Sequence, residues 1–245
     1  MKRIEKRDEP LRLREWKRTT VNFPDAHYNS HEFPAAAVNQ ALVAEQGGLC
    51  GYTMIRITEA TSHNEHIKPR SVSKNEVPPR FDETSDFLNL IACYPNTGSS
   101  GGKCPFGAEV KGNAWDPENM VTPLMGNCEA RFAFEFSGKV AAANSDDEAA
   151  KWTIDTLCLD HEQLRTLRKQ ACHDACLTPD HPSPLTARQA LELAENICNR
   201  SKSGTFAPFC VVIRQVATVY AKKLEAAKLK RKHATRSLAK KEKRK

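Results

Sequence analysis

The apolar residues of this chain come in short runs, and this limits the folds that are open to it. No run approaches the ~18–20 residues that a membrane-crossing helix needs, so we expect no membrane span. Hydrophobic residues make up 40% of the 245 residues, enough for one good-sized core. Strand-like runs concentrate in the first 140 residues, and helical patterns dominate after about residue 155. We therefore expect an α+β protein with one compact centre and helical additions.

Three of the short runs have the composition of strands. Residues 49–58 place residues that favour strands on two alternating sides, and residues 87–94 form a short run typical of a buried strand. Residues 131–140 alternate phenylalanines with smaller or charged residues and then reach a glycine, which predicts a strand and a turn.

Four segments repeat apolar residues at helical spacing. Pro34 opens the first segment, and Gly47 and Gly48 close it. Two others begin with a capping residue followed by glutamine three positions later, Asp160 in one and Thr186 in the other. The expected helices cover residues 34–48, 159–176, 185–200 and 210–229.

The positive charge of the chain is concentrated near its C-terminal end. Residues 222–245 hold twelve Lys and Arg and two Glu, a net charge of +10, so the remaining residues carry +7 minus +10, or −3. A basic tail of this kind usually promotes solubility or makes weak, nonspecific contact with nucleic acid. Composition divides the chain into an arm (1–34), a core (35–140), a helical region (141–221) and a basic tail (222–245), helical or disordered.

The cysteines and the N-terminal residues indicate a reducing compartment. The first 18 residues are basic and no apolar run follows them, so we expect no secretory signal and a cytoplasmic protein. The nine cysteines are then interpreted as reduced thiols, core residues or metal ligands. Cys172 and Cys176 share a helix face, but no second pair lies nearby, so we expect core thiols there.

The polar stretch TSHNEHIKPRS, residues 61–71, is the strongest candidate for a site. Its Glu65-His66 pair follows a predicted strand, Asn89 comes later in NLIAC, and a glycine-rich loop leads to EVKGN at residues 109–113. An acid-histidine pair, an asparagine and a Lys-Gly step appear in this order in ββα-metal nucleases.

The chain resembles the HNH endonucleases, and most closely the HNH subunits of Septu-type anti-phage systems, some of which are carried beside retrons. The resemblance covers roughly residues 1–170. The segments that carry it are RIEKRDEP, LVAEQGGLCGYTMIRI, HNEHIKPRS, NLIAC, VKGN, PLMGNCEARFAFEFSGKV and TIDTLCLDHEQLRTLRK. It implies a ββα-metal nuclease core with a helical C-terminal extension and a basic tail.

The resemblance also implies roles for individual residues. His66 is expected to act as the general base, and Glu65 as a ligand of Mg²⁺ or another divalent cation, which prefers oxygen donors. Asn89 either holds the His66 imidazole in its productive tautomer or binds the metal, and His63 orients the residues around it. The same comparison assigns Lys68 and Lys111 to contacts with substrate phosphates.

Two departures from the family pattern affect metal binding. Thr53 stands where the family has the partner of Cys50, and Gly107 stands where it has another cysteine, so only Cys50, Cys93 and Cys104 remain. Because a structural zinc site needs four ligands, we expect no structural Zn²⁺ and interpret these thiols as small hydrophobic residues.

The second departure concerns the third active-site element. Phe106 and Ala108 occupy the positions before Lys111-Gly112 where the family has a metal ligand. Glu109 or Asn113 supplies the missing oxygen if the loop is shifted.

The function expected from the resemblance is metal-dependent hydrolysis of phosphodiester bonds in DNA or tRNA. The protein is expected to be the toxic effector of an anti-phage complex, restrained by an ABC- or SMC-like ATPase and by a retron reverse transcriptase with its RNA–DNA hybrid. The alternative is a degenerate HNH scaffold that binds nucleic acid or a partner without catalysis.

Overall fold

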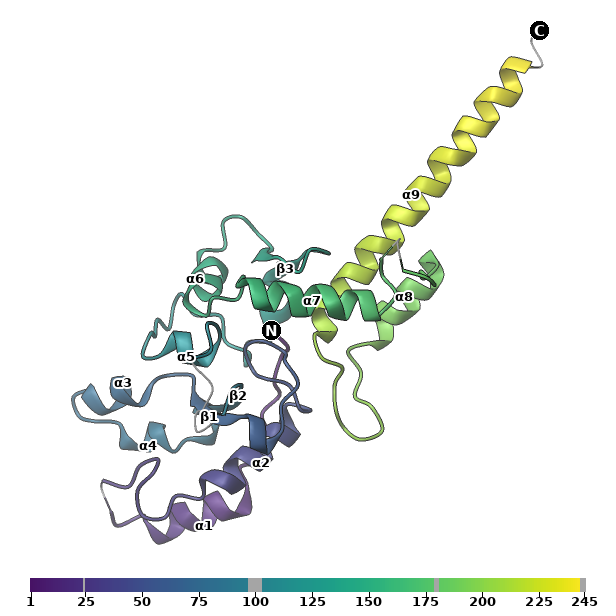
Figure 1. Cartoon of the computed structure of the whole chain (residues 1–245). Coiled ribbons are helices and arrows are strands. Elements are labelled where there is room, and N and C mark those ends of the chain that lie inside the picture. Colours follow the sequence, from purple (N-terminus) through teal and green to yellow (C-terminus); the bar gives the residue numbers. More distant parts are fainter. Residues whose placement is uncertain (24, 97–102, 179–180, 243–245) are drawn as a thin grey trace.

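A computed structural model describes residues 1–23, 25–96, 103–178 and 181–242. Over these residues the protein is a mixed α+β structure that is mostly helical, with small two-stranded sheets and a long C-terminal helix (Figure 1). The predicted glycine-rich loop at residues 95–107 lies partly outside the described residues.

The first part of the chain surrounds a short antiparallel sheet. Its helices, 3₁₀ helices (η) and strands are α1 (Leu11–Thr19), α2 (Ala35–Glu45), η1 (Glu59–Thr61), β1 (His63–His66), α3 (Arg70–Asn75), α4 (Phe81–Thr84), η2 (Phe87–Asn89), β2 (Leu90–Cys93) and α5 (Ala108–Lys111). Strand β2 is buried along its whole length, and α2 packs against both strands. The β1–β2 register pairs Glu65 with Ile91 and His66 with Leu90.

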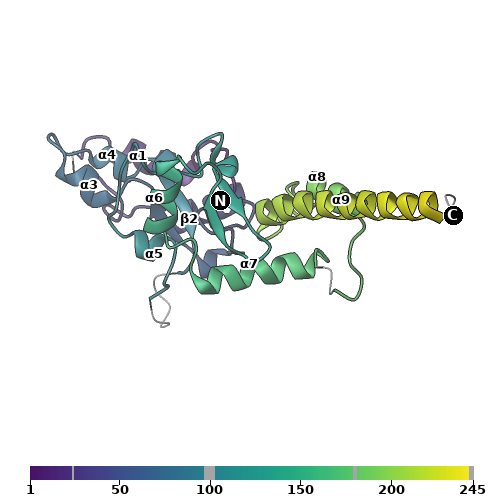
Figure 2. The ribbon, with the colours of Figure 1, turned by 90° about the horizontal axis from the view of Figure 1, so that it is seen from above.

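The second part is a hairpin followed by helices. Its elements are η3 (Cys128–Ala130), β3 (Phe132–Phe134), β4 (Val140–Ala142), α6 (Glu148–Thr156), α7 (Glu162–Asp174), α8 (Ala187–Asn196) and α9 (Cys210–Glu242). Helix α8 packs along the first part of α9, whose later turns extend away from the body (Figures 1 and 2). No helix within the described ranges has both the length and the apolarity needed to cross a membrane.

Several sequence predictions are confirmed. The segment 34–48 forms α2, which ends before Gly47 and Gly48, both at positive φ. Residues 131–140 form the hairpin strand β3 and its turn. The predicted cap of α8 forms as a capping box between Thr186 and Gln189.

Two predictions of local structure are wrong. Residues 49–58 do not form a strand: they make a tight turn in which Cys50 N donates to Ile55 O, and only an isolated bridge joins Leu49 to Arg56. Helix α7 is capped by His161, because the Asp160 carboxylate instead accepts a hydrogen bond from Val140 N.

One core cluster joins the N-terminal arm to the body. Met1, Ile4, Leu13 and Trp16 are buried in the same cluster as the residues around β2 and the first turns of α9. Burial of these apolar side chains stabilises the position of the arm against the body. The arm therefore packs against the core.

Candidate active site

An open cleft of about 720 Å³ lies beside β1. It is lined by residues of β1, by the start of α3, by α5 with the residues after it, and by Tyr28 and Asn29. His63, Glu65 and His66 all line this cleft, and so do Glu109 and Asn113. The structure therefore brings together most of the residues that the sequence singled out.

Glu65 is held by a buried lysine from α5. Lys111 Nζ lies 2.7 Å from Glu65 Oε1 and donates to His66 O at 2.9 Å. The Lys111 residue is only 2% exposed and does not line the cleft. In this arrangement the buried Lys111 ammonium offsets the charge of Glu65 from inside the protein. It is not exposed in the cleft, where the resemblance led us to expect a contact with a substrate phosphate.

His63 lies on the same side of β1 as Glu65, since side chains two positions apart share a face. Its Nε2 is 3.7 Å from Glu65 Oε2, and its Nδ1 bonds to Pro95 O. Burial lowers the pKa of His63, but the hydrogen bonds to Glu65 and to the Pro95 carbonyl outweigh it and raise the pKa above its ordinary value. The environment thus favours the imidazolium form of His63.

His66 is 6% exposed and its ring meets Tyr28 edge-on at 4.7 Å. Its Nε2 donates to Thr84 O at 2.8 Å, because a carbonyl can only accept. Burial lowers the pKa of His66 to about 4, so the imidazole is neutral at pH 7. The neutral tautomer leaves a lone pair on Nδ1, which makes no hydrogen bond to any of the described residues.

Asn89 lies at the end of η2 and connects two backbone segments. Its Oδ1 accepts from Lys68 N at 2.8 Å, and its Nδ2 donates to Lys68 O and Glu83 O. Lys68 itself forms ion pairs with Glu76 and Glu83, each at 2.5 Å. Neither the Asn89 nor the Lys68 side chain lines the cleft. Asn89 instead holds the backbone that follows β1 in position, and the ion pairs of Lys68 link that segment to the residues that precede β2.

The cleft contains two carboxylates of the kind that bind magnesium ions in proteins. Mg²⁺ is usually held by one or two carboxylates while keeping several waters. Glu65 and Glu109 both line the cleft, and Glu65 Oε2 has His63 as its neighbour at 3.7 Å. Within the described part of the chain, no group of three or more His, Cys, Asp or Glu side chains is placed so that it could hold a metal ion.

The cleft has two cations to which the sequence analysis gave no role. Arg70 and Lys74 both come from α3, and Arg70 lies over the Tyr28 ring at 5.2 Å. Arg70 belongs to the HNEHIKPRS block, but its position on a helix that borders the cleft was not predictable from the block itself. Unlike Lys68 and Lys111, these two side chains line the cleft.

The three cysteines that were considered as zinc ligands lie in the core. The residues Cys50, Cys93 and Cys104 are buried. Burial raises the pKa of Cys50, but hydrogen bonds to Cys93, Thr53 and the Tyr94 N–H outweigh it and lower the pKa to about 6. Thr53, which stands where the family has a cysteine, therefore bonds to the Cys50 sulfur.

Comparison of the sequence with family models and with curated proteins finds no match. The site is therefore interpreted from its own residues and geometry.

Proposed function

We propose that the cleft beside β1 binds and hydrolyses a phosphodiester bond of nucleic acid, in the manner of a metal-dependent HNH nuclease with a ββα-metal core. The observation that carries the proposal is that Glu65 and His66, adjacent on β1, line one open cleft together with the cations Arg70 and Lys74. Hydrolysis needs a base for the attacking water and positive charge for the phosphate oxygens. The cleft supplies both.

His66 is the proposed general base. Its Nε2–H is fixed on the Thr84 carbonyl, so the lone pair of Nδ1 accepts the proton of the attacking water. The low pKa keeps the imidazole neutral and available, although it also makes His66 a weak base. The hydrogen bond to Thr84 O fixes the tautomer of His66. This is one of the two roles that the resemblance suggested for Asn89.

Arg70 and Lys74 are the proposed contacts to the substrate backbone. Both border the cleft on α3, and a guanidinium binds phosphate oxygens through parallel hydrogen bonds. The imidazolium form of His63, favoured by Glu65, adds positive charge on the floor of the same cleft. These groups hold the phosphodiester and offset the charge that develops on it.

Glu65 and Glu109 are the residues that would hold the divalent cation, since both line the cleft. When bound, Mg²⁺ supplies Lewis-acid stabilisation of the phosphate and of the leaving oxygen. Lys111 keeps the Glu65 carboxylate in place by its bond to Oε1, while Oε2 lies 3.7 Å from His63 Nε2.

The biological setting is proposed from the resemblance alone. The protein acts as the effector of an anti-phage complex, in which an ABC- or SMC-like ATPase and a retron reverse transcriptase with its RNA–DNA hybrid restrain cleavage. The test of the substrate is incubation of plasmid DNA and of total tRNA with the purified protein, with and without Mg²⁺. Cleavage of one substrate that needs Mg²⁺ supports the proposal and identifies the substrate.

A second candidate is a non-catalytic module that binds nucleic acid or a partner. It is favoured by the Lys111–Glu65 ion pair, which neutralises the main metal ligand, and by the absence of Asn89 from the cleft. This candidate predicts that the protein binds both nucleic acids and cleaves neither at any Mg²⁺ concentration.

A further inference from the structure

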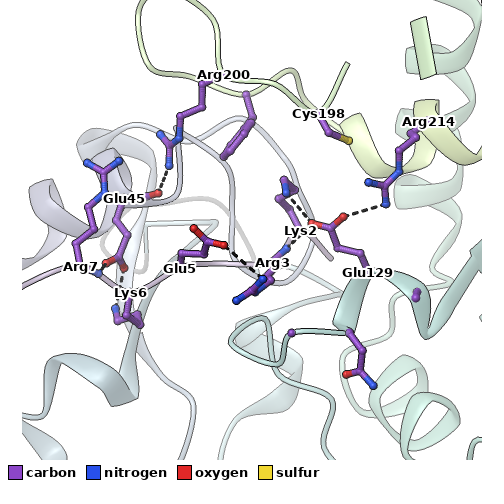
Figure 3. Close-up of a pocket in the computed structure, with 14 residues that line it drawn as sticks. Lys2, Arg3, Glu5, Lys6, Arg7, Glu45, Glu129, Cys198, Arg200 and Arg214 are labelled. Carbon is purple, nitrogen blue, oxygen red and sulfur yellow. Dashed lines mark hydrogen bonds and ion pairs between the residues drawn. The ribbon is translucent and has the colours of Figure 1, made fainter. Parts of the chain in front are cut away.

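Two clefts adjoin on a part of the surface that shares no lining residue with the candidate active site. The first, of about 640 Å³, lies between residues 2–7, the end of α2, the segment around η3 and the start of α9 (Figure 3). The second, of about 710 Å³, lies between the end of α2, residues 56–59 and residues 200–205. Arg7 and Arg200 line both clefts, so the two form one continuous surface, the basic groove.

Positive residues outnumber negative ones along the basic groove. Residues 1–221 together carry a net charge of −3, so this excess is local. The groove is lined by seven basic residues, Lys2, Arg3, Lys6, Arg7, Arg56, Arg200 and Arg214, and by four acidic ones, Glu5, Glu45, Glu59 and Glu129.

Four of the cations have a carboxylate partner inside the groove. Lys2 and Arg214 share the Glu129 carboxylate, at 2.6 and 2.9 Å. Lys6 pairs with Glu45 at 2.8 Å, and Arg3 pairs with Glu5 of the same arm at 3.4 Å. The pairs of Lys2, Arg214 and Lys6 join the N-terminal arm to α2, η3 and α9, so they are part of the framework of the groove.

Three arginines have no carboxylate partner among the described residues: Arg7, Arg56 and Arg200. The guanidinium groups of Arg56 and Arg200 donate to backbone carbonyl oxygens near the end of α2 and in the loop before α9. Carbonyl oxygens fix the orientation of a guanidinium without cancelling its charge. The Arg7 guanidinium makes no hydrogen bond or ion pair to the described residues, and only its backbone N–H binds Glu45.

Arg7 and Arg200 lie close enough to repel each other. Figure 3 shows both side chains extending beside Glu45. Burial, and then the charge of Arg7, lower the pKa of Arg200 below its ordinary value. An anion between the two guanidinium groups removes this repulsion, so the pair is better suited to an anionic ligand than to solvent alone.

We propose that the basic groove binds the phosphodiester backbone of a nucleic-acid strand. Guanidinium groups match phosphate oxygens through paired hydrogen bonds, and Arg is preferred over Lys where this geometry matters. A single phosphate engages the Arg7–Arg200 pair, whereas a strand with repeated phosphates also reaches Arg56 in the adjoining cleft. The basic groove is thus a second nucleic-acid contact, separate from the proposed site of hydrolysis.

The test compares Arg7→Glu with Arg12→Glu in the full chain. Arg12 is exposed on α1 and lines neither cleft of the groove, so it is a control with the same charge change. Binding of a labelled 20-nucleotide single strand, as DNA and as RNA, is measured by fluorescence anisotropy in EDTA from 50 to 200 mM KCl. EDTA keeps the measurement independent of whether the active-site cleft cleaves, and pyrophosphate is added as a competitor.

We expect Arg7→Glu to raise the Kd at least tenfold at 100 mM KCl and to reduce the slope of log Kd against log [KCl] by about 0.7, one phosphate contact on a single strand. Arg12→Glu is expected to stay within twofold of wild type. Equal effects of the two variants overturn the proposal, because they assign binding to net charge. Competition by pyrophosphate as strong as by unlabelled strand also overturns it, in favour of a small phosphate ligand. If Arg7→Glu shifts the thermal midpoint, Arg7→Gln replaces it and a threefold rise in Kd is expected.

Discussion

Lys111 Nζ lies 2.7 Å from Glu65 Oε1 and is buried, so one ammonium from α5 fixes the carboxylate at the centre of the candidate active site. The two residues are 46 positions apart in sequence. The pair thus connects α5 to β1.

Replacement of Lys111 by methionine should destabilise the protein strongly. It leaves a largely buried Glu65 carboxylate without its partner, and breaking such a pair costs about 3 kcal/mol or more. Chemical denaturation of Lys111→Met measures this cost. The double variant Glu65→Gln, Lys111→Met should recover most of the lost free energy of unfolding; a double variant as unstable as the single one contradicts the role of the pair.

Gly138 should tolerate alanine far less well than Gly204. Both glycines have φ near +80°, which strains any L residue, but a Cβ at Gly138 would lie 2.0 Å from Arg165 O while a Cβ at Gly204 meets nothing within 4 Å. We expect Gly204→Ala to lower the free energy of unfolding by about 1–2 kcal/mol, from backbone strain alone. Gly138→Ala should lower it by more than about 4 kcal/mol, because the hairpin must also separate from α7. Similar losses for the two variants would show that the contact is absent.

The sequence predicted the elements whose signals are local. Thr186 and Gln189 satisfy each other within one turn, so α8 was predictable from four residues. The apolar pattern of residues 49–58 was misread as a strand because nearly all of its side chains are buried in a turn, where alternation carries no information about pairing.

The candidate site was predictable where its residues are neighbours in sequence. His63 and Glu65 are two positions apart, so their presence on one side of β1 follows from the strand alone. His66 points to the opposite face of the strand, so its place in the same cleft depends on how the rest of the chain packs around β1. The burial of Lys111 and the position of Arg70 depend on how α5 and α3 pack against that strand. Such long-range packing leaves no pattern in a short motif.

Glu129 should make the stability of the protein depend on pH in acid. Burial raises its pKa, but the hydrogen bond from Lys2 and its other basic partners outweigh this and hold the pKa below its ordinary value of 4.5. A carboxylate with a lowered folded pKa contributes stability above its unfolded pKa and loses it as pH falls through the folded value. Between pH 5 and pH 3, Glu129→Gln should therefore lose less free energy of unfolding than wild type; equal losses would exclude this linkage.

Glu109 should matter for cation binding at the active site. If Glu65 and Glu109 together hold Mg²⁺, Glu109→Gln raises the Mg²⁺ concentration for half-maximal cleavage about tenfold, because one charged oxygen donor is lost. Glu118→Gln is the control, since Glu118 is exposed and does not line the cleft. EDTA should stop cleavage by wild type, and added Mg²⁺ should restore it. Cleavage that continues in EDTA would contradict a metal-dependent reaction.

The most direct test of the proposed function is the rate at which His66→Gln cleaves the substrate that wild type cleaves. Loss of a general base lowers the rate by about 100-fold or more, while the Gln amide nitrogen can take the place of the imidazole Nε2 and keep the hydrogen bond to Thr84 O. His173→Gln, a change at a partly exposed histidine of α7, is the control and should cleave like wild type. The account predicts that His66→Gln binds the substrate normally and cleaves it at least 100-fold more slowly; cleavage at the wild-type rate would contradict it.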